Sequence, residues 1–183
     1  MLPIDSVTRQ PGEGGAAGHR PSPAAPLAMR AVLDTNTVLD WLVFADEAAR
    51  AVGTAIAQRR LRWLATTAML AELQAVLARP LPPRWQPARE LALTIDFAQL
   101  ACLCAEPALD PRHPICRDAS DQKFIDLALQ QSPTVLLTRD RALLALRRKA
   151  AALGVEVATA AAWRPRLDAL AAQHAGLETA ADP

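Results

Sequence analysis

From residue 29 onward, the sequence alternates short apolar runs with longer amphipathic segments, and this alternation limits the fold more than any other feature. The apolar runs typical of buried strands are 31–34, 61–66, 134–138 and 155–159. The segments with helical periodicity are 46–60, 67–79, about 87–104, 120–131 and 140–153. Alternating strands and helices predict a parallel sheet with helices on both faces, a three-layer α/β/α sandwich.

The two ends of the chain differ from this pattern. Residues 1–28 contain five of the 15 prolines and four of the seven glycines, and we expect a disordered extension there. Because Met29 directly precedes the first strand, translation could start at either Met1 or Met29. We expect one folded domain over residues 29–163 and a short, weakly packed tail over 164–183.

Composition narrows the class of protein. Hydrophobic residues make up 51% and charged residues 21% of the chain, which is typical of a globular domain. The net charge of +1 gives no strong global attraction to nucleic acid, so any such binding must use local patches. Three cysteines without paired spacing indicate reduced thiols and a cytoplasmic location. No apolar run approaches the ~18 residues that span a membrane, so we expect no membrane association.

Two acidic residues follow predicted strands directly. Asp34 ends the first apolar run, and Asp140 stands two residues after the run 134–138. Because the carboxyl ends of parallel strands meet at one edge of a sheet, we expect these two side chains to lie close together. Burying a carboxylate without a partner costs several kcal/mol or forces its protonation, so we expect another group to pair with Asp34.

Three further acids are placed to join them. Glu72 lies on a helix face that is otherwise apolar, with Ala68, Met69 and Val76 as neighbours, so we expect it to point toward the protein. Asp118 and Asp121 are three residues apart at the start of a helix and can share one face.

Clustered carboxylates repel one another, and a hard divalent cation removes the conflict. Mg²⁺ or Mn²⁺ prefers oxygen ligands and keeps several waters, one of which can attack a phosphodiester. Each acid alone also has an ordinary explanation. Asp34 and Asp140 suit turns or helix caps, and Asp118 and Asp121 suit a helix N-terminus. Only the joint pattern points to a metal site.

Four motifs resemble the PIN-domain nucleases, and in particular the PIN-domain proteins assigned as toxins of bacterial toxin–antitoxin pairs. These motifs are LDTNTVLDWL (33–42), LAELQAVL (70–77), CRDASDQKFIDLAL (116–129) and LLTRDRALLAL (136–146). The resemblance spans about residues 30–163 and implies a parallel sheet between helices, commonly in a homodimer.

The resemblance also implies a function and a set of site residues. It implies an endoribonuclease that uses Mg²⁺ or Mn²⁺, with RNA as substrate and an antitoxin protein as partner. Matched to the family motifs, the metal-binding acids are Asp34, Glu72, Asp121 and Asp140, Asp118 is an additional catalytic acid, and Asn36 and Thr138 orient the site.

An RNA substrate needs cationic contacts to its phosphates. Arg117 and Arg139 stand beside acids of the predicted site, and Arg141 follows Asp140, so these three are candidate RNA contacts.

Two alternatives remain. A haloacid-dehalogenase-type phosphatase uses a second Asp two residues after the first, and here that position is Asn36, which cannot act as a general acid. The domain could also be catalytically inactive and only bind RNA or an antitoxin.

Overall fold

We describe the protein from a computed structural model that covers residues 29–131 and 134–179. The predicted extension over residues 1–28 lies outside these described residues, as do residues 132–133 and 180–183.

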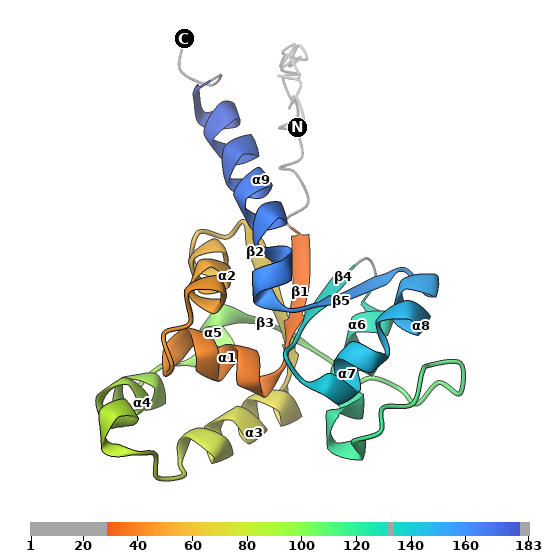
Figure 1. Ribbon diagram of the computed structural model, residues 1–183, viewed down its shortest axis with the longest axis horizontal. Coiled ribbons are helices and arrows are strands. Elements are labelled where there is room, and N and C mark those ends of the chain that lie inside the picture. The colour runs from red at the N-terminus through yellow and green to blue at the C-terminus, as the bar shows by residue number, and fades with distance from the viewer. Residues whose placement is uncertain (1–28, 132–133, 180–183) are drawn as a thin grey trace, which may run out of the picture.

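Within this part of the chain, five parallel strands form one sheet in the order β3-β2-β1-β4-β5 (Figure 1). The strands are β1 (Met29–Leu33), β2 (Leu61–Thr66), β3 (Ala101–Cys104), β4 (Thr134–Leu137) and β5 (Val155–Ala158). The strand order reverses between β1 and β4, and in open parallel sheets ligands bind outside the carboxyl ends of the strands at such a point.

Helices cover both faces of the sheet, which confirms the predicted three-layer architecture (Figure 1). The helices on the first face are α1 (Thr35–Leu42), α2 (Glu47–Ala57), α3 (Thr67–Leu77), α4 (Gln86–Leu93), α5 (Phe97–Leu100) and α9 (Ala160–Thr179), with the short 3-10 turn η1 (Pro83–Trp85) before α4. The helices on the second face are α6 (Gln122–Gln130), α7 (Arg141–Ala145) and α8 (Arg147–Ala152), with the 3-10 turn η2 (Ala119–Asp121) before α6.

Successive residues of a strand point to opposite faces, so each central strand contributes to two cores. In β1, Ala31 and Leu33 pack into the first core and Val32 into the second. In β4, Leu137 and Leu136 divide in the same way. Because both faces are buried, these strands are continuous apolar runs, as parallel strands usually are.

The structure corrects three expectations. The segment 87–104 is not one helix: it forms α4 and α5 and then the edge strand β3, which pairs with β2 from Trp63 to Thr66. The segment 140–153 forms two short helices, α7 and α8, rather than one. The segment after Trp163 is not a weakly packed tail, because it continues α9 to Thr179 and buries Leu167 against the first core.

Helices α1 and α2 approach closely at Gly53. A Cβ atom built on Gly53 would lie 2.0 Å from the ring of Trp41, which in turn packs edge-on against Trp63 with ring centroids 6.3 Å apart. The absence of a side chain at residue 53 therefore allows the contact between the two helices.

We predict that Gly53→Ala destabilises the protein by about 1–3 kcal/mol, because displacing Trp41 outweighs the gain in helix propensity of up to ~1 kcal/mol. Urea unfolding of the variant measures this change. Thr54→Ala, at the neighbouring exposed position of the same helix, is the control and should change stability little. A Gly53→Ala protein as stable as the wild type would contradict the packing seen here.

Candidate active site

Asp34 is the first residue after β1 and only 2% of its surface is exposed. Its backbone N–H donates to the carbonyl of Leu137 in β4 (3.1 Å), which extends the pairing of the two strands by one residue. Its Oδ1 accepts a hydrogen bond from the backbone N–H of Thr37 (2.6 Å), and its Oδ2 accepts one from the hydroxyl of Thr138 (2.5 Å). Asp34 is therefore the N-cap of α1, which is one of the ordinary roles expected for it. It is also a buried carboxylate at the point where the strand order reverses.

Thr138 connects Asp34 to Asp140. The Thr138 hydroxyl donates to Asp34 and accepts a hydrogen bond from the backbone N–H of Asp140 (2.9 Å). The backbone N–H of Thr138 donates to the carbonyl of Ala158 at the end of β5 (2.9 Å). Thr138 is 1% exposed, so its geometry is fixed from three directions.

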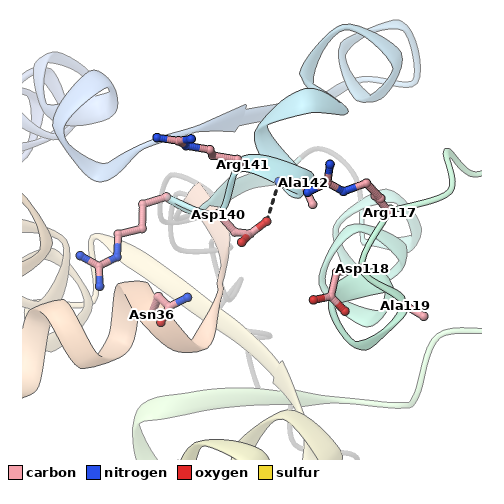
Figure 2. A pocket seen from close by; sticks show the side chains of 8 residues that line it. Asn36, Arg117, Asp118, Ala119, Asp140, Arg141 and Ala142 are labelled. Carbon is pink, nitrogen blue, oxygen red and sulfur yellow. Dashed lines mark hydrogen bonds between the residues drawn. The ribbon is translucent and has the colours of Figure 1, made fainter.

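Asp140 caps α7 in the same way that Asp34 caps α1. Its Oδ1 accepts hydrogen bonds from the backbone N–H groups of Ala142 (2.6 Å) and Leu143 (3.2 Å), the first of which Figure 2 shows as a dashed line. The expected placement of Asp34 and Asp140 at one edge agrees with the structure, since the charge of Asp140 contributes to raising the pKa of Asp34.

Asp121 is the last residue of η2 and the N-cap of α6, and it belongs to the same electrostatic cluster. The pKa of its carboxyl is raised to about 6, mainly by burial and then by the charges of Asp140, Asp118 and Asp34, while Lys123 opposes the rise. Among the described residues, no donor forms a hydrogen bond with the Asp121 carboxylate. It is thus the acid of this cluster that most needs a cation.

Asp118 lies at the rim. Its carboxylate accepts hydrogen bonds from the backbone N–H (2.9 Å) and hydroxyl (2.7 Å) of Ser120, and these bonds hold the pKa of Asp118 below its usual value. Its side chain is solvent-exposed, so a capping role explains its contacts as well as a catalytic one does.

The orientation of the Glu72 side chain differs from the one that the helix pattern predicted. It is half-exposed rather than turned into the apolar core, and Ala68 on the same face is exposed. Its Oε1 accepts a hydrogen bond from the hydroxyl of Thr35 (2.9 Å), directly after Asp34, and its Oε2 pairs with the ammonium of Lys123 (2.5 Å). Glu72 therefore faces the strand-end edge from α3.

A cavity of about 670 Å³ opens beside two of these acids, Asp118 and Asp140. Figure 2 shows Asn36 and Asp140 on one side of it and Arg117 and Asp118 on the other. Its full lining is Asn36, Arg117, Asp118, Ala119, Arg139, Asp140, Arg141 and Ala142.

All three candidate cations in this cavity, Arg117, Arg139 and Arg141, are exposed. Arg139 also forms an ion pair (3.1 Å) with Asp40 of α1, and the side chain of Asp40 is largely buried. Burial raises the pKa of Asp40, and the charge of Arg139 opposes that rise, so Arg139 stabilises a buried acid besides lining the cavity.

Several residues that hold the acids in place were not among the predicted site residues. Thr37 donates its hydroxyl to the Leu137 carbonyl (3.1 Å), and Thr35 and Lys123 hold Glu72. Their position beside acids, in DTNT and in SDQK, is the signal that could have identified them.

A second group fixes the loop before Asp118. His113 Nδ1 lies 2.9 Å from Asp126 in α6, and Gln122 donates to the same carboxylate (2.8 Å) and accepts from the Cys116 backbone N–H (2.7 Å). His113 therefore has a structural role in holding this loop against α6.

The donor set fits a hard divalent cation. The charge of Asp140 raises the pKa of both Asp34 and Asp121, and no hydrogen-bond donor compensates Asp121 among the described residues. Within residues 29–131 and 134–179, no three acidic, histidine or cysteine side chains already stand in a metal-binding arrangement, so the acids would have to move closer together around an ion.

This arrangement is that of an α/β domain with clustered acids at the switch point of its sheet. A model of the PIN domain family matches residues 30–142, which include every acid described above. The chain belongs to the PIN domain family, whose members are generally nucleases that use divalent metals and act on nucleic acid. No curated protein matches the chain. None of the described helices is long and apolar enough to cross a membrane.

We predict that Thr138→Val lowers the free energy of unfolding by about 1–3 kcal/mol at pH 7, because the buried Asp34 carboxylate loses a donor. Thr138→Ser keeps the hydroxyl and is the matched control. Urea unfolding of the three proteins measures the difference, and equal stability of the Val and Ser variants would contradict the role given to the hydroxyl.

We also predict that Asp121→Asn stabilises the metal-free protein at pH 7.5. The folded pKa of about 6 exceeds the usual 3.8, so the wild type loses stability as pH rises from about 4 to about 6. The variant lacks this loss, and its Tm in EDTA should exceed that of the wild type by up to about 4 °C, the shift that 1 kcal/mol gives in a domain of this size. The difference should vanish at pH 4, and a pH-independent difference would contradict the assignment.

Proposed function

We propose that this protein is a Mg²⁺- or Mn²⁺-dependent endoribonuclease and the toxin of a toxin–antitoxin pair. The observation that supports a metal-dependent reaction most strongly is the mutual charge repulsion among Asp34, Asp121 and Asp140. In this proposal these three acids, with Glu72, hold one or two divalent ions, and Asp118 assists from the rim.

When bound, the metal supplies an acidified water for attack on the phosphodiester and offsets charge on the phosphate oxygens. The residues of the chain prepare this chemistry. Thr37 and Thr138 hold both oxygens of Asp34 in place, and the first backbone N–H groups of α7 hold Asp140. Such preorganisation spares the site a rearrangement during the reaction.

The substrate would enter the polar cavity. Arg117 and Arg141 are exposed there and are the better candidates for phosphate contacts, since Arg139 is already paired with Asp40. Asn36 lines the same cavity and can donate a hydrogen bond to a phosphate or a ribose hydroxyl.

The partners of the proposal follow from the family resemblance. We propose a homodimer in the cytoplasm and an antitoxin protein that blocks the site formed by the acids. An antitoxin that does so would present cationic side chains to the acids.

We predict that the wild type cleaves RNA only with added Mn²⁺ or Mg²⁺, and that Asp34→Asn and Asp121→Asn each lower the rate at least about 100-fold, or 2.7 kcal/mol in the barrier. A gel assay on a mixture of single-stranded and structured RNA, with matched DNA, measures this. Asp168→Asn, an exposed acid on α9, is the control and should cleave like the wild type.

The outcomes separate the alternatives. Preference for DNA would overturn the ribonuclease assignment but not the nuclease one. Metal binding without cleavage of either nucleic acid would favour a binding protein. Phosphatase activity on small phosphate esters would favour the haloacid-dehalogenase alternative.

A further inference from the structure

Lys123 lies among the acids and already forms contacts with the site. It is in the first turn of α6, two residues after Asp121, and its ammonium pairs with Glu72 Oε2 (2.5 Å) from α3. The ammonium also donates to the carbonyl of Ser120 and lies 4.8 Å from the centre of the Phe124 ring. Only 22% of its side chain is exposed, so these contacts fix its position.

The pairing divides the acids into two groups. Both oxygens of Glu72 are engaged, one by Thr35 and one by Lys123. Among the described residues, no cation forms an ion pair with Asp34, Asp121 or Asp140, although the charge of Lys123 lowers the pKa of Asp121. The Glu72 end of the site thus has a cation in contact, and in the part of the chain that the structure describes the other end has none.

A lysine, as at residue 123, is uncommon among the basic residues of this chain. Of its 20 basic residues only Lys123 and Lys149 are lysines, and the rest are arginines. An ammonium is a compact point charge on a flexible stem, whereas a guanidinium is a planar fork. A compact charge can occupy the volume of a small cation between Glu72 and the backbone of η2.

We propose that the Lys123 ammonium takes the place of a second divalent ion, so that the site binds one Mg²⁺ or Mn²⁺ at Asp34, Asp121 and Asp140. This inference rests on the proposed function. Lys123 is then a positioning residue that holds Glu72 away from the bound ion, and its positive charge repels a second one.

The test is the number of Mn²⁺ ions bound per chain, measured on the full-length protein by calorimetry and by the electron paramagnetic resonance of free Mn²⁺. We expect one ion for the wild type and two for Lys123→Met, which keeps the apolar stem against Phe124 but removes the charge. Lys149→Met is the matched control, because it removes the chain's other lysine, which lies on α8. This variant should bind one ion.

A second variant protects the test against misfolding. Lys123→Gln also removes the charge but can still donate a hydrogen bond to Glu72, and it should likewise bind two Mn²⁺ ions because no positive charge repels the second one. Circular dichroism of each variant verifies the fold.

Each contrary result has a distinct meaning. Two ions in the wild type, or one ion in the folded Lys123→Met and Lys123→Gln proteins, would overturn the role of Lys123 and leave the nuclease proposal standing. No Mn²⁺ bound by the wild type would overturn the proposed metal dependence, and the inference with it.

Discussion

The buried carboxylate of Asp34 is the constraint on which the rest of the site depends. It lies at the one place in the sheet where the strand order reverses, with β2 on one side of β1 and β4 on the other. A charge there is tolerated because two donors from different parts of the chain converge on it, the Thr37 backbone and the Thr138 hydroxyl. Thr138 in turn binds the backbone of Asp140, so the same contacts that satisfy one acid position the next.

The acids are held by contacts that serve the fold as well. Asp34, Asp118 and Asp140 each accept hydrogen bonds from the start of a helical turn, and such capping stabilises a helix whether or not a metal binds. Asp121 is the exception, because burial and like charges raise its pKa and no described donor compensates. Burial is the largest cause of the raised pKa values of both Asp34 and Asp121, and only Asp34 has hydrogen-bond donors that partly offset it.

The central part of the fold could be predicted from sequence because its signals are local. The apolar runs at β1, β2, β4 and β5 are rich enough in branched residues to indicate strands. The run ACLC at β3 is poor in such residues, and the leucine- and alanine-rich sequence around it favours helix. It forms a strand because it pairs with β2. The tail beyond Trp163 was misjudged for a related reason: its alanines predict little burial, yet Leu167 packs into the first core. For the site, strand-end acids were predictable from topology, whereas the contacts of Glu72 with Thr35 and Lys123 join segments far apart in sequence that no periodicity connects.

The strand β5 lies outside the span matched by the family model, yet it contacts a residue of the candidate site. The match ends at residue 142, and the carbonyl of Ala158, sixteen residues later, receives the backbone N–H of Thr138. A chain shortened to the matched span would keep every acid but lose the neighbour that fixes the residue between two of them. A domain boundary drawn at the end of the family match would therefore separate Thr138 from the strand that fixes its backbone.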